Sequence, residues 1–168
     1  MQRRTLLTLG LASTAVLFVA GGAAALLEPG LRRGALSPLG REVFTAVGLA
    51  VLDKTLPAEP GAREIALNGL LSRVDVLATA LPPHAQHELS QLLSLLGSAA
   101  GRRTLAGLGT PWAEASVAEV QQALQGMRLS SLALRQQAYA ALHDITAGAY
   151  FSDPASWLLL GYPGPVKI

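Results

Sequence analysis

The sequence predicts an all-α fold: a small helical bundle, preceded by an apolar N-terminal segment and followed by an irregular aromatic tail. Three observations lead to this prediction. Apolar residues recur at helical spacing after residue 31, prolines and glycines divide the chain into helix-length pieces, and no segment alternates usefully with the period of a strand. Of the 168 residues, 51% are hydrophobic and 14% charged, which excludes a disordered, charge-rich chain.

Residues 1–30 have the layout of an export signal. A basic start is followed by an uncharged stretch over 5–27 that contains small residues at 21–25, as is typical of secretory signals. The adjacent arginines followed by leucines resemble the twin-arginine signal. The signal residues are Arg3, Arg4, Leu6 and Leu7. We expect export by the twin-arginine translocase, with an ordinary secretory signal as the alternative.

The same segment is long enough to span a bilayer, which takes about 20 apolar residues. Three alanines at 23–25 permit cleavage after Ala25, but Leu26 and Leu27 continue the apolar run beyond that point. Residues 1–30 are therefore interpreted as a signal peptide or, if it is not cleaved, a membrane anchor. Residues 31–168 form the exported domain.

The first three helices of this domain are delimited by prolines. Ser37-Pro38 begins the first, because serine caps a helix and proline fits its first turn. Pro57 and Pro60-Gly61 end it, a second helix runs through Ile65, Leu70 and on to Leu81, and a third follows Pro82-Pro83. The apolar face of the first helix carries Leu39, Val43, Val47 and Val51.

The second half of the domain begins with a glycine-rich stretch. We predict a loop over 97–111, with a short turn around Leu105 and Leu108. Ser116 to Glu119 is a capping-box pattern that starts a fourth helix. A fifth helix begins after Ser130 or Ser131, which we expect to cap it, and a last short turn runs from 152 to 160.

We expect no catalytic, cofactor-binding or metal site in this chain. No nucleotide-binding or serine-nucleophile motif occurs, and the absence of cysteine excludes disulfides and thiolate-bound clusters. His84 and His87, beside Glu88, supply at most half a metal site, so surface placement is the alternative that we favour. His143 and Asp144 are sequence neighbours whose side chains diverge by roughly 100° on a helix, so no acid–base pair is expected.

The C-terminal tail, residues 149–168, holds a concentration of aromatic residues. Five of the eight aromatics lie in roughly the last 30 residues, interleaved with glycine and proline that oppose regular helix. Such a tail either folds back over its own core or docks onto a partner, since aromatic residues anchor interfaces. The candidate docking residues are Tyr150, Phe151, Trp157, Tyr162, Pro163, Gly164 and Pro165.

Two segments resemble a known family. The string Tyr150 to Pro154, followed by Trp157 and by Leu160 to Pro165, resembles the C-terminal signature of the gluconate 2-dehydrogenase subunit 3 family. Upstream, Leu52 to Pro57 with Pro60-Gly61-Ala62 resembles that family's D-x-x-[IL]-P and P-G-A segment. The resemblance extends over about residues 37–166, and a leading twin-arginine signal agrees with it.

The resemblance implies a non-catalytic small subunit of a periplasmic dehydrogenase that associates with the inner membrane. In that family the partner is a large flavoprotein similar to glucose–methanol–choline oxidoreductases, which carries FAD and oxidises an alcohol, sugar or sugar acid. A cytochrome c subunit with haem c often passes the electrons on. The small subunit assists maturation and twin-arginine export of the large one and stays bound to it.

The charge balance does not indicate a nucleic-acid partner. The net charge is +2, which equals the contribution of Arg3 and Arg4, and no basic run is interleaved with aromatics. The alternative to the subunit interpretation is a stand-alone exported helical envelope protein that binds a ligand or a structural partner. An enzyme is the third possibility.

Overall fold

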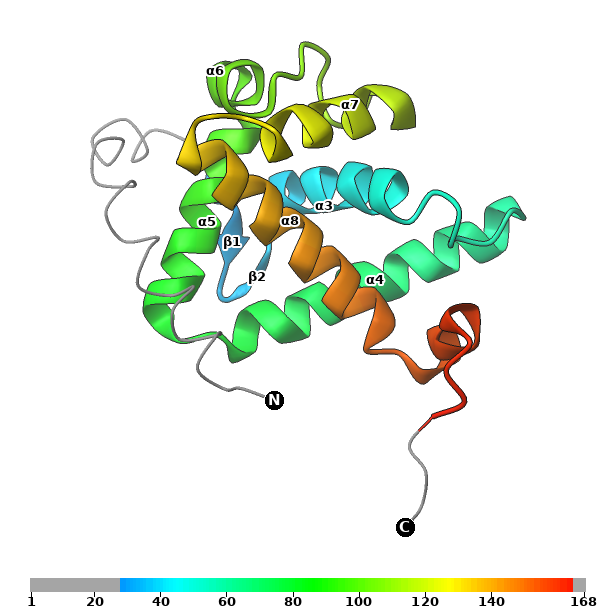
Figure 1. The fold of residues 1–168 in the computed structure, drawn as a ribbon. Helices are drawn as coiled ribbons and strands as arrows, with labels where there is room; N and C mark the ends of the chain where they lie inside the picture. Colours follow the sequence, from blue (N-terminus) through cyan, green and yellow to red (C-terminus); the bar gives the residue numbers. More distant parts are fainter. Residues whose placement is uncertain (1–27, 165–168) are drawn as a thin grey trace.

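The computed structural model describes residues 28–164, without the side chains of Leu159 and Leu160. The signal residues Arg3, Arg4, Leu6 and Leu7 and the tail residue Pro165 lie outside the described residues. Within them the chain is mostly helical, as predicted (Figure 1). The elements are β1 (Leu31–Arg32), β2 (Ala35–Leu36), α3 (Pro38–Val51), α4 (Pro60–Ala80), α5 (Pro83–Gly97), α6 (Ala99–Gly101), the π-helical turn η2 (Arg102–Ala106), α7 (Val117–Arg128), α8 (Ala133–Phe151) and the 3-10 helix η3 (Pro154–Leu160).

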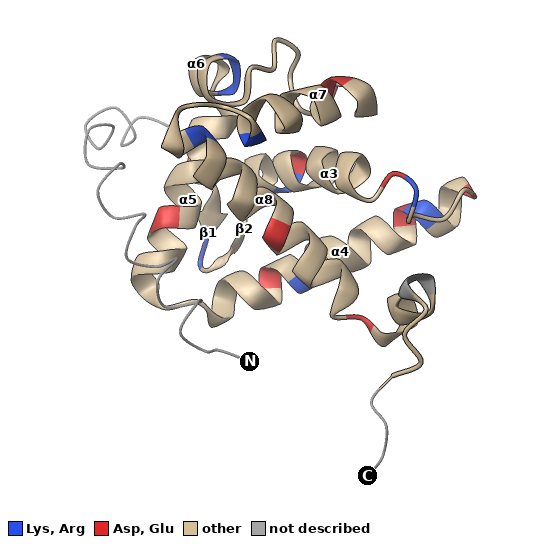
Figure 2. Cartoon of the chain, in the orientation of Figure 1, with Lys and Arg blue, Asp and Glu red and all other residues tan. Residues whose placement is uncertain are grey.

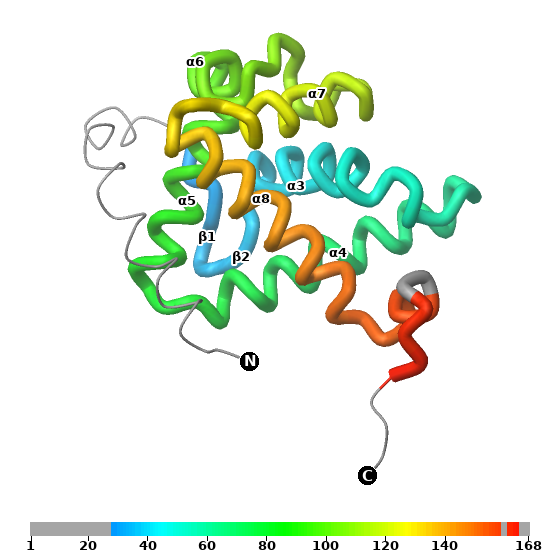
Figure 3. The backbone as a smooth tube through the Cα atoms, viewed as in Figure 1, coloured from blue at the N-terminus to red at the C-terminus, as the bar shows by residue number. Residues whose placement is uncertain are grey.

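Helix α3 is the centre of the bundle and packs against α4, α5, α7 and α8. Its residues Val43, Phe44 and Val47 are completely buried. The predicted start is confirmed: the Ser37 hydroxyl accepts a hydrogen bond from the Gly40 N–H at 3.1 Å. Figure 3 traces α8 diagonally across the bundle, from the loop after α7 to η3.

A short hairpin, absent from the sequence prediction, precedes α3. Strands β1 and β2 pair antiparallel, with Leu31 opposite Leu36, and both leucines are buried. Arg33 and Gly34 form the turn with φ of 53° and 82°, and positive φ at both positions is what a two-residue hairpin turn of type I′ requires. Each strand has two residues, too few for an alternating pattern to be visible in the sequence.

Helix α4 begins earlier than predicted. Pro60-Gly61, expected only to end the preceding helix, forms the first turn of α4. The Glu59 carboxylate caps it by accepting hydrogen bonds from the Gly61 and Ala62 N–H groups, and these bonds lower the pKa of Glu59, the Ala62 bond more strongly. Leu70 is the first fully buried residue of α4, so the first half of the helix extends beyond the bundle (Figure 1).

The prediction of a loop over 97–111 is wrong in its first half. Ser98 caps α6 by accepting a hydrogen bond from the Gly101 N–H at 3.0 Å, and the chain continues through η2 to Gly107, whose φ of 75° ends the turn. Leu105 is buried, and the indole N–H of buried Trp112 donates to the Leu96 carbonyl at 2.8 Å. Packing therefore holds a glycine-rich segment in helical form.

The start of α7 is as predicted and that of α8 is not. Ser116 and Glu119 form the predicted capping box. Helix α8 instead starts after Leu132, which makes no side-chain cap. The Ser130 hydroxyl accepts the Leu132 N–H at 3.1 Å, so this serine shapes the turn before the helix rather than capping it.

Candidate partner-docking site

The tail that we expected to be irregular from residue 149 begins as helix. Tyr150 and Phe151 are the last two residues of α8, because Tyr150 has a core position to fill: it is only 6% exposed. Its hydroxyl lies 3.5 Å from the Thr55 carbonyl, to which it donates, and burial raises the pKa of this phenol. Tyr150 therefore belongs to the chain's own core, the first of the two alternatives given for the tail.

Arg73 of α4 fixes the end of α8. Its Nε donates to the Ala149 carbonyl at 2.7 Å, and its Nη1 to Asp153 Oδ2 at 3.0 Å. The first bond satisfies a carbonyl in the last turn of a helix, where no intrahelical partner remains. The second crosses 80 residues of sequence. A single guanidinium thus joins α4, the end of α8 and the start of η3.

The helix η3 is locked by further short-range hydrogen bonds. Asp153 caps it, with Oδ1 accepting the Ala155 N–H at 2.9 Å, and the hydroxyl of buried Ser156 donates to the Asp153 carbonyl at 2.6 Å. The indole N–H of Trp157 donates to the Phe151 carbonyl at 2.9 Å. The backbone of this segment is consequently well defined although it lies beyond the main bundle (Figure 1).

The last described residues return over the indole ring. Gly161, with φ of 67°, ends η3, and the rings of Trp157 and Tyr162 then lie 5.4 Å apart at 56°. Gly164 also approaches Trp157: a Cβ at this glycine would lie 3.6 Å from Cζ3 of the indole. We call residues 150–164 the C-terminal platform.

The C-terminal platform leaves two large apolar side chains in solvent. Leu158 is 80% exposed and Tyr162 is 46% exposed. Of the other predicted docking residues, Phe151, Trp157 and Gly164 are half-buried and Pro163 is exposed. Leu158 was not among the predicted residues. It is the first of three consecutive leucines after Trp157, and the sequence does not show which of the three is exposed.

The two segments that carry the family resemblance meet in space. The Thr55 carbonyl that receives the Tyr150 hydroxyl belongs to the segment 52–62, some 95 residues earlier in the chain. That segment is braced in turn by Arg63, whose Nε donates to the Pro57 carbonyl at 3.0 Å. The sequence predicted neither this contact nor the role of Arg73. The available signal was an arginine among the buried Leu70, Leu71 and Val74 of α4.

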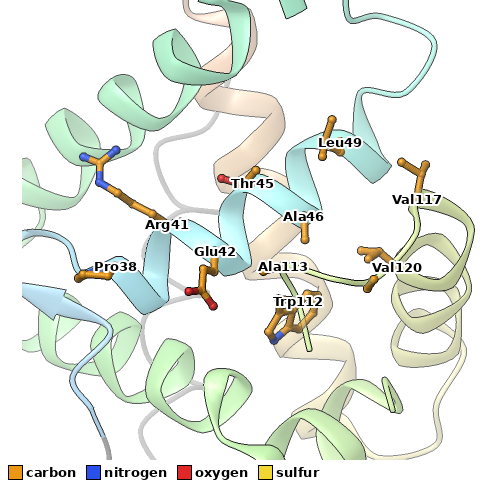
Figure 4. A pocket seen from close by; sticks show the side chains of 11 residues that line it. Pro38, Arg41, Glu42, Thr45, Ala46, Leu49, Trp112, Ala113, Val117 and Val120 are labelled. Atoms are coloured by element: carbon orange, nitrogen blue, oxygen red, sulfur yellow. The ribbon is translucent and has the colours of Figure 1, made fainter. Parts of the chain in front are cut away.

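A separate groove of about 320 Å³ runs along the outer face of α3 (Figure 4). Its walls are mainly apolar and come from α3 on one side and from residues 112–120 on the other. Trp112 and Val120 are buried in the wall, whereas Glu42 lies at the rim. Arg41, also at the rim, is paired with Asp75. The groove could hold a small, largely apolar molecule.

The histidines lie apart from both features. His87 Nε2 lies 2.8 Å from Gln91 Nε2, and no group of three or more His, Cys, Asp or Glu residues within 28–164 could hold a metal ion. His143 and Asp144 do touch, with Nδ1 and Oδ1 3.0 Å apart, contrary to the expected divergence. Both side chains are well exposed, and rotation about their side-chain bonds brings the two groups together despite the angular separation of the helix positions.

No helix within residues 28–164 combines the length and the apolar character needed to cross a membrane. Neither a scan against protein-family models nor searches of curated proteins and of solved structures finds a match to this chain.

Proposed function

We propose that this chain is the small, non-catalytic subunit of a membrane-associated periplasmic FAD-dependent alcohol or sugar dehydrogenase. It assists maturation and twin-arginine export of the flavoprotein and stays bound to it through the C-terminal platform. The observation that carries this proposal is the meeting of the two family-like segments at Tyr150 and Thr55, beside a platform that exposes Leu158 and Tyr162.

The platform has the physical properties of a docking element. Its backbone is already ordered by Arg73, Asp153 and Trp157, so a partner that binds it pays little conformational entropy. Leu158 and Tyr162 supply apolar area to such a partner, and tyrosine is one of the residues that most often dominate interface energetics.

The test is purification of the tagged full chain from native membranes. We expect a flavoprotein to accompany it, visible as a flavin absorption spectrum and as substrate-dependent dye reduction. The substitutions Leu158→Ser and Tyr162→Ser should reduce the co-purified flavin. Val76→Ser, on the exposed face of α4 at 70% exposure, is the matched control and should leave it unchanged.

Equal flavin recovery from all three variants would refute the role of the platform. A purified chain that lacks flavoprotein altogether, or that turns over a substrate unaided, would refute the proposed function itself.

The export part of the proposal is tested by replacing Arg3 and Arg4 with lysine, since the twin-arginine translocase reads the arginine pair. We expect both subunits to remain in the cytoplasm. Dehydrogenase activity that still reaches the periplasm would count against export of the flavoprotein in complex with this chain.

A second candidate is a stand-alone exported envelope protein, and the groove along α3 is the observation that favours it. Its volume of about 320 Å³ is at the lower end for a small-molecule site. This candidate would be favoured if the purified chain contained no flavoprotein and bound an apolar ligand that the Ala46→Trp variant does not bind.

A further inference from the structure

One end of the molecule carries only positive charge. Element η2, the end of α7 and the start of α8 converge there and hold four arginines, which we call the arginine end: Arg102, Arg103, Arg128 and Arg135. No Asp or Glu occurs over 89–113 or 120–143. Figure 2 shows the blue positions on these elements, while the red on α7 lies toward its opposite end. The described residues contain 10 Lys and Arg and 11 Asp and Glu in all, so the rest of the surface is acidic.

Two of the arginines are built into the fold. Arg135 Nε donates to the Leu105 carbonyl at 2.8 Å, and its Nη2 lies against Gly107 and Gly126, which joins α8 to η2 and α7. Arg102 is only 8% exposed, and its Nε has no hydrogen-bond partner in the described part of the chain. Arginine stays charged in such surroundings, so the arginine end holds positive charge that no carboxylate there compensates.

The other two arginines are free to reach a ligand. Arg103 and Arg128 are exposed, and neither side chain forms a hydrogen bond or ion pair with another residue of 28–164. Between Arg128 and Arg135 runs the loop that joins α7 to α8, and it presents Leu129 at 69% and Leu132 at 62% exposure.

We propose that the arginine end binds the surface of an anionic lipid bilayer, with Leu129 and Leu132 inserted below the head groups and the arginines bound to lipid phosphates. Exposed aliphatic side chains on a loop between basic residues can satisfy both parts of a membrane interface, the acyl boundary and the anionic head groups. A protein partner would favour aromatic anchors, and residues 113–138 contain none.

The first described residues of the chain lie near this end. The Gly30 N–H donates to the Ser94 hydroxyl at 3.0 Å, and Ser94 is in the last turn of α5, directly before Ser98 and η2. Gly30, among the first residues that the structure describes, therefore lies beside the part of α5 that leads into the arginine end. Glu28, the first acidic residue of the sequence, is paired with Arg32 at 2.9 Å, so it does not compensate the arginine end. The proposal does not depend on the flavoprotein partner.

The absence of cysteine allows a single-site test on the full chain. Leu129→Cys is labelled with a polarity-sensitive fluorophore and reconstituted into vesicles of phosphatidylcholine, or of equal parts phosphatidylcholine and phosphatidylglycerol. Because the label sits at position 129, its emission reports the surroundings of the loop and not the state of residues 1–30. We expect a blue shift of its emission only in the anionic vesicles, and loss of that shift in high salt.

Two variants complete the design. Val76→Cys carries the same label on an equally exposed apolar position of α4 and should show no shift. Arg103→Glu with Arg128→Glu should abolish the shift at position 129 while circular dichroism stays unchanged, because neither arginine has a partner to lose within residues 28–164.

Three outcomes would overturn the proposal: no shift at position 129 in anionic vesicles, an equal shift at position 76, or a shift that survives the double charge reversal. A label that responds to an added acidic flavoprotein but not to vesicles would identify a protein contact instead of a membrane contact.

Discussion

The two ends of α8 both expose large apolar side chains, but in opposite chemical settings. At its C-terminal end the C-terminal platform presents Leu158 and Tyr162 on a backbone fixed by hydrogen bonds. At its N-terminal end, about 28 Å away along a 19-residue helix, Leu129 and Leu132 stand among arginines. Exposed apolar area alone therefore does not indicate a partner, and the neighbouring groups decide which kind it suits.

The difference is clearest in how each end uses arginine. Arg73 donates hydrogen bonds to the Ala149 carbonyl and to the Asp153 carboxylate, so its charge is compensated and its role is structural. Arg103 and Arg128 have no such partner among the described residues, and their charge remains available to a ligand. The first arrangement favours a rigid protein contact and the second an adaptable contact with lipid.

The largest expected effect tests whether α8 supports both ends. Leu142 lies midway along α8 and is fully buried. Leu142→Ala should cost about 2–5 kcal/mol of unfolding free energy, measured in urea, because it removes apolar contacts and leaves a cavity. Both ends should lose protection from hydrogen exchange together. Leu132→Ala, exposed in the loop, is the control and should change the unfolding free energy by about 0.5 kcal/mol or less.

The next substitution should separate the two ends. Arg73→Gln removes the guanidinium that bonds to both Ala149 and Asp153, and we expect a local loss of about 1–3 kcal/mol at the C-terminal platform. Amide exchange at Trp157 should accelerate while exchange in α7 stays unchanged. Arg63→Gln, which loses one bond to a loop carbonyl, should have a smaller effect. Faster exchange at both ends would show that the platform is not an independent unit.

The features that the sequence predicted are those with local causes. The caps at Ser37 and Ser116 act within three residues, and the apolar faces of α3, α5 and α7 repeat within one helix. The hydrogen bonds from Arg73 to Ala149 and Asp153 join residues 76 and 80 positions apart, so no local sequence pattern predicts them. The sequence indicated a short turn around Leu105 but not the continuous helical path through α6 and η2, because glycines predict loop, whereas burial of Leu105 and Trp112 holds this segment helical.

The candidate sites were predictable only in part. The aromatic cluster indicated the C-terminal platform, but the sequence could not separate buried Tyr150 from exposed Tyr162, because both belong to the same short run of aromatic, glycine and proline residues. The arginine end was invisible in the sequence, since its four arginines are spread over 34 positions and three elements. Only the packing of α7 and α8 against η2 brings them to one end.

A smaller effect is expected at Gly107, which ends η2 beside Arg135 at the arginine end. Gly107 has a φ of 75°, and a Cβ there would lie 3.3 Å from Arg135 Nη2. Gly107→Ala should therefore cost about 1–2 kcal/mol, because a side chain is strained in the left-handed region. Gly109→Ala is the matched control, since its added Cβ meets nothing within 4 Å. Thermal unfolding measures both, and equal losses would show that Gly107 is not a conformational requirement.

The smallest expected effect is acid sensitivity at the starts of two helices, α4 and α7; the far end of α7 carries Arg128. The pKa of Glu119, at the start of α7, is lowered by hydrogen bonds from the Ser116 hydroxyl, then from the Ser116 N–H and the Thr110 hydroxyl. The pKa of Glu59, at the start of α4, is lowered by the Ala62 and Gly61 N–H groups.

Because each folded pKa lies below the unfolded value of 4.5, the stabilisation is complete above that pH and is lost as the pH falls through the folded value. We expect amide exchange in the first turns of α4 and α7 to accelerate over that acidic range before the core opens. Glu119→Gln should remove the pH dependence at α7 and leave that at α4 intact. If both turns lost their pH dependence together, the two helix starts would be coupled through the core and would not open independently.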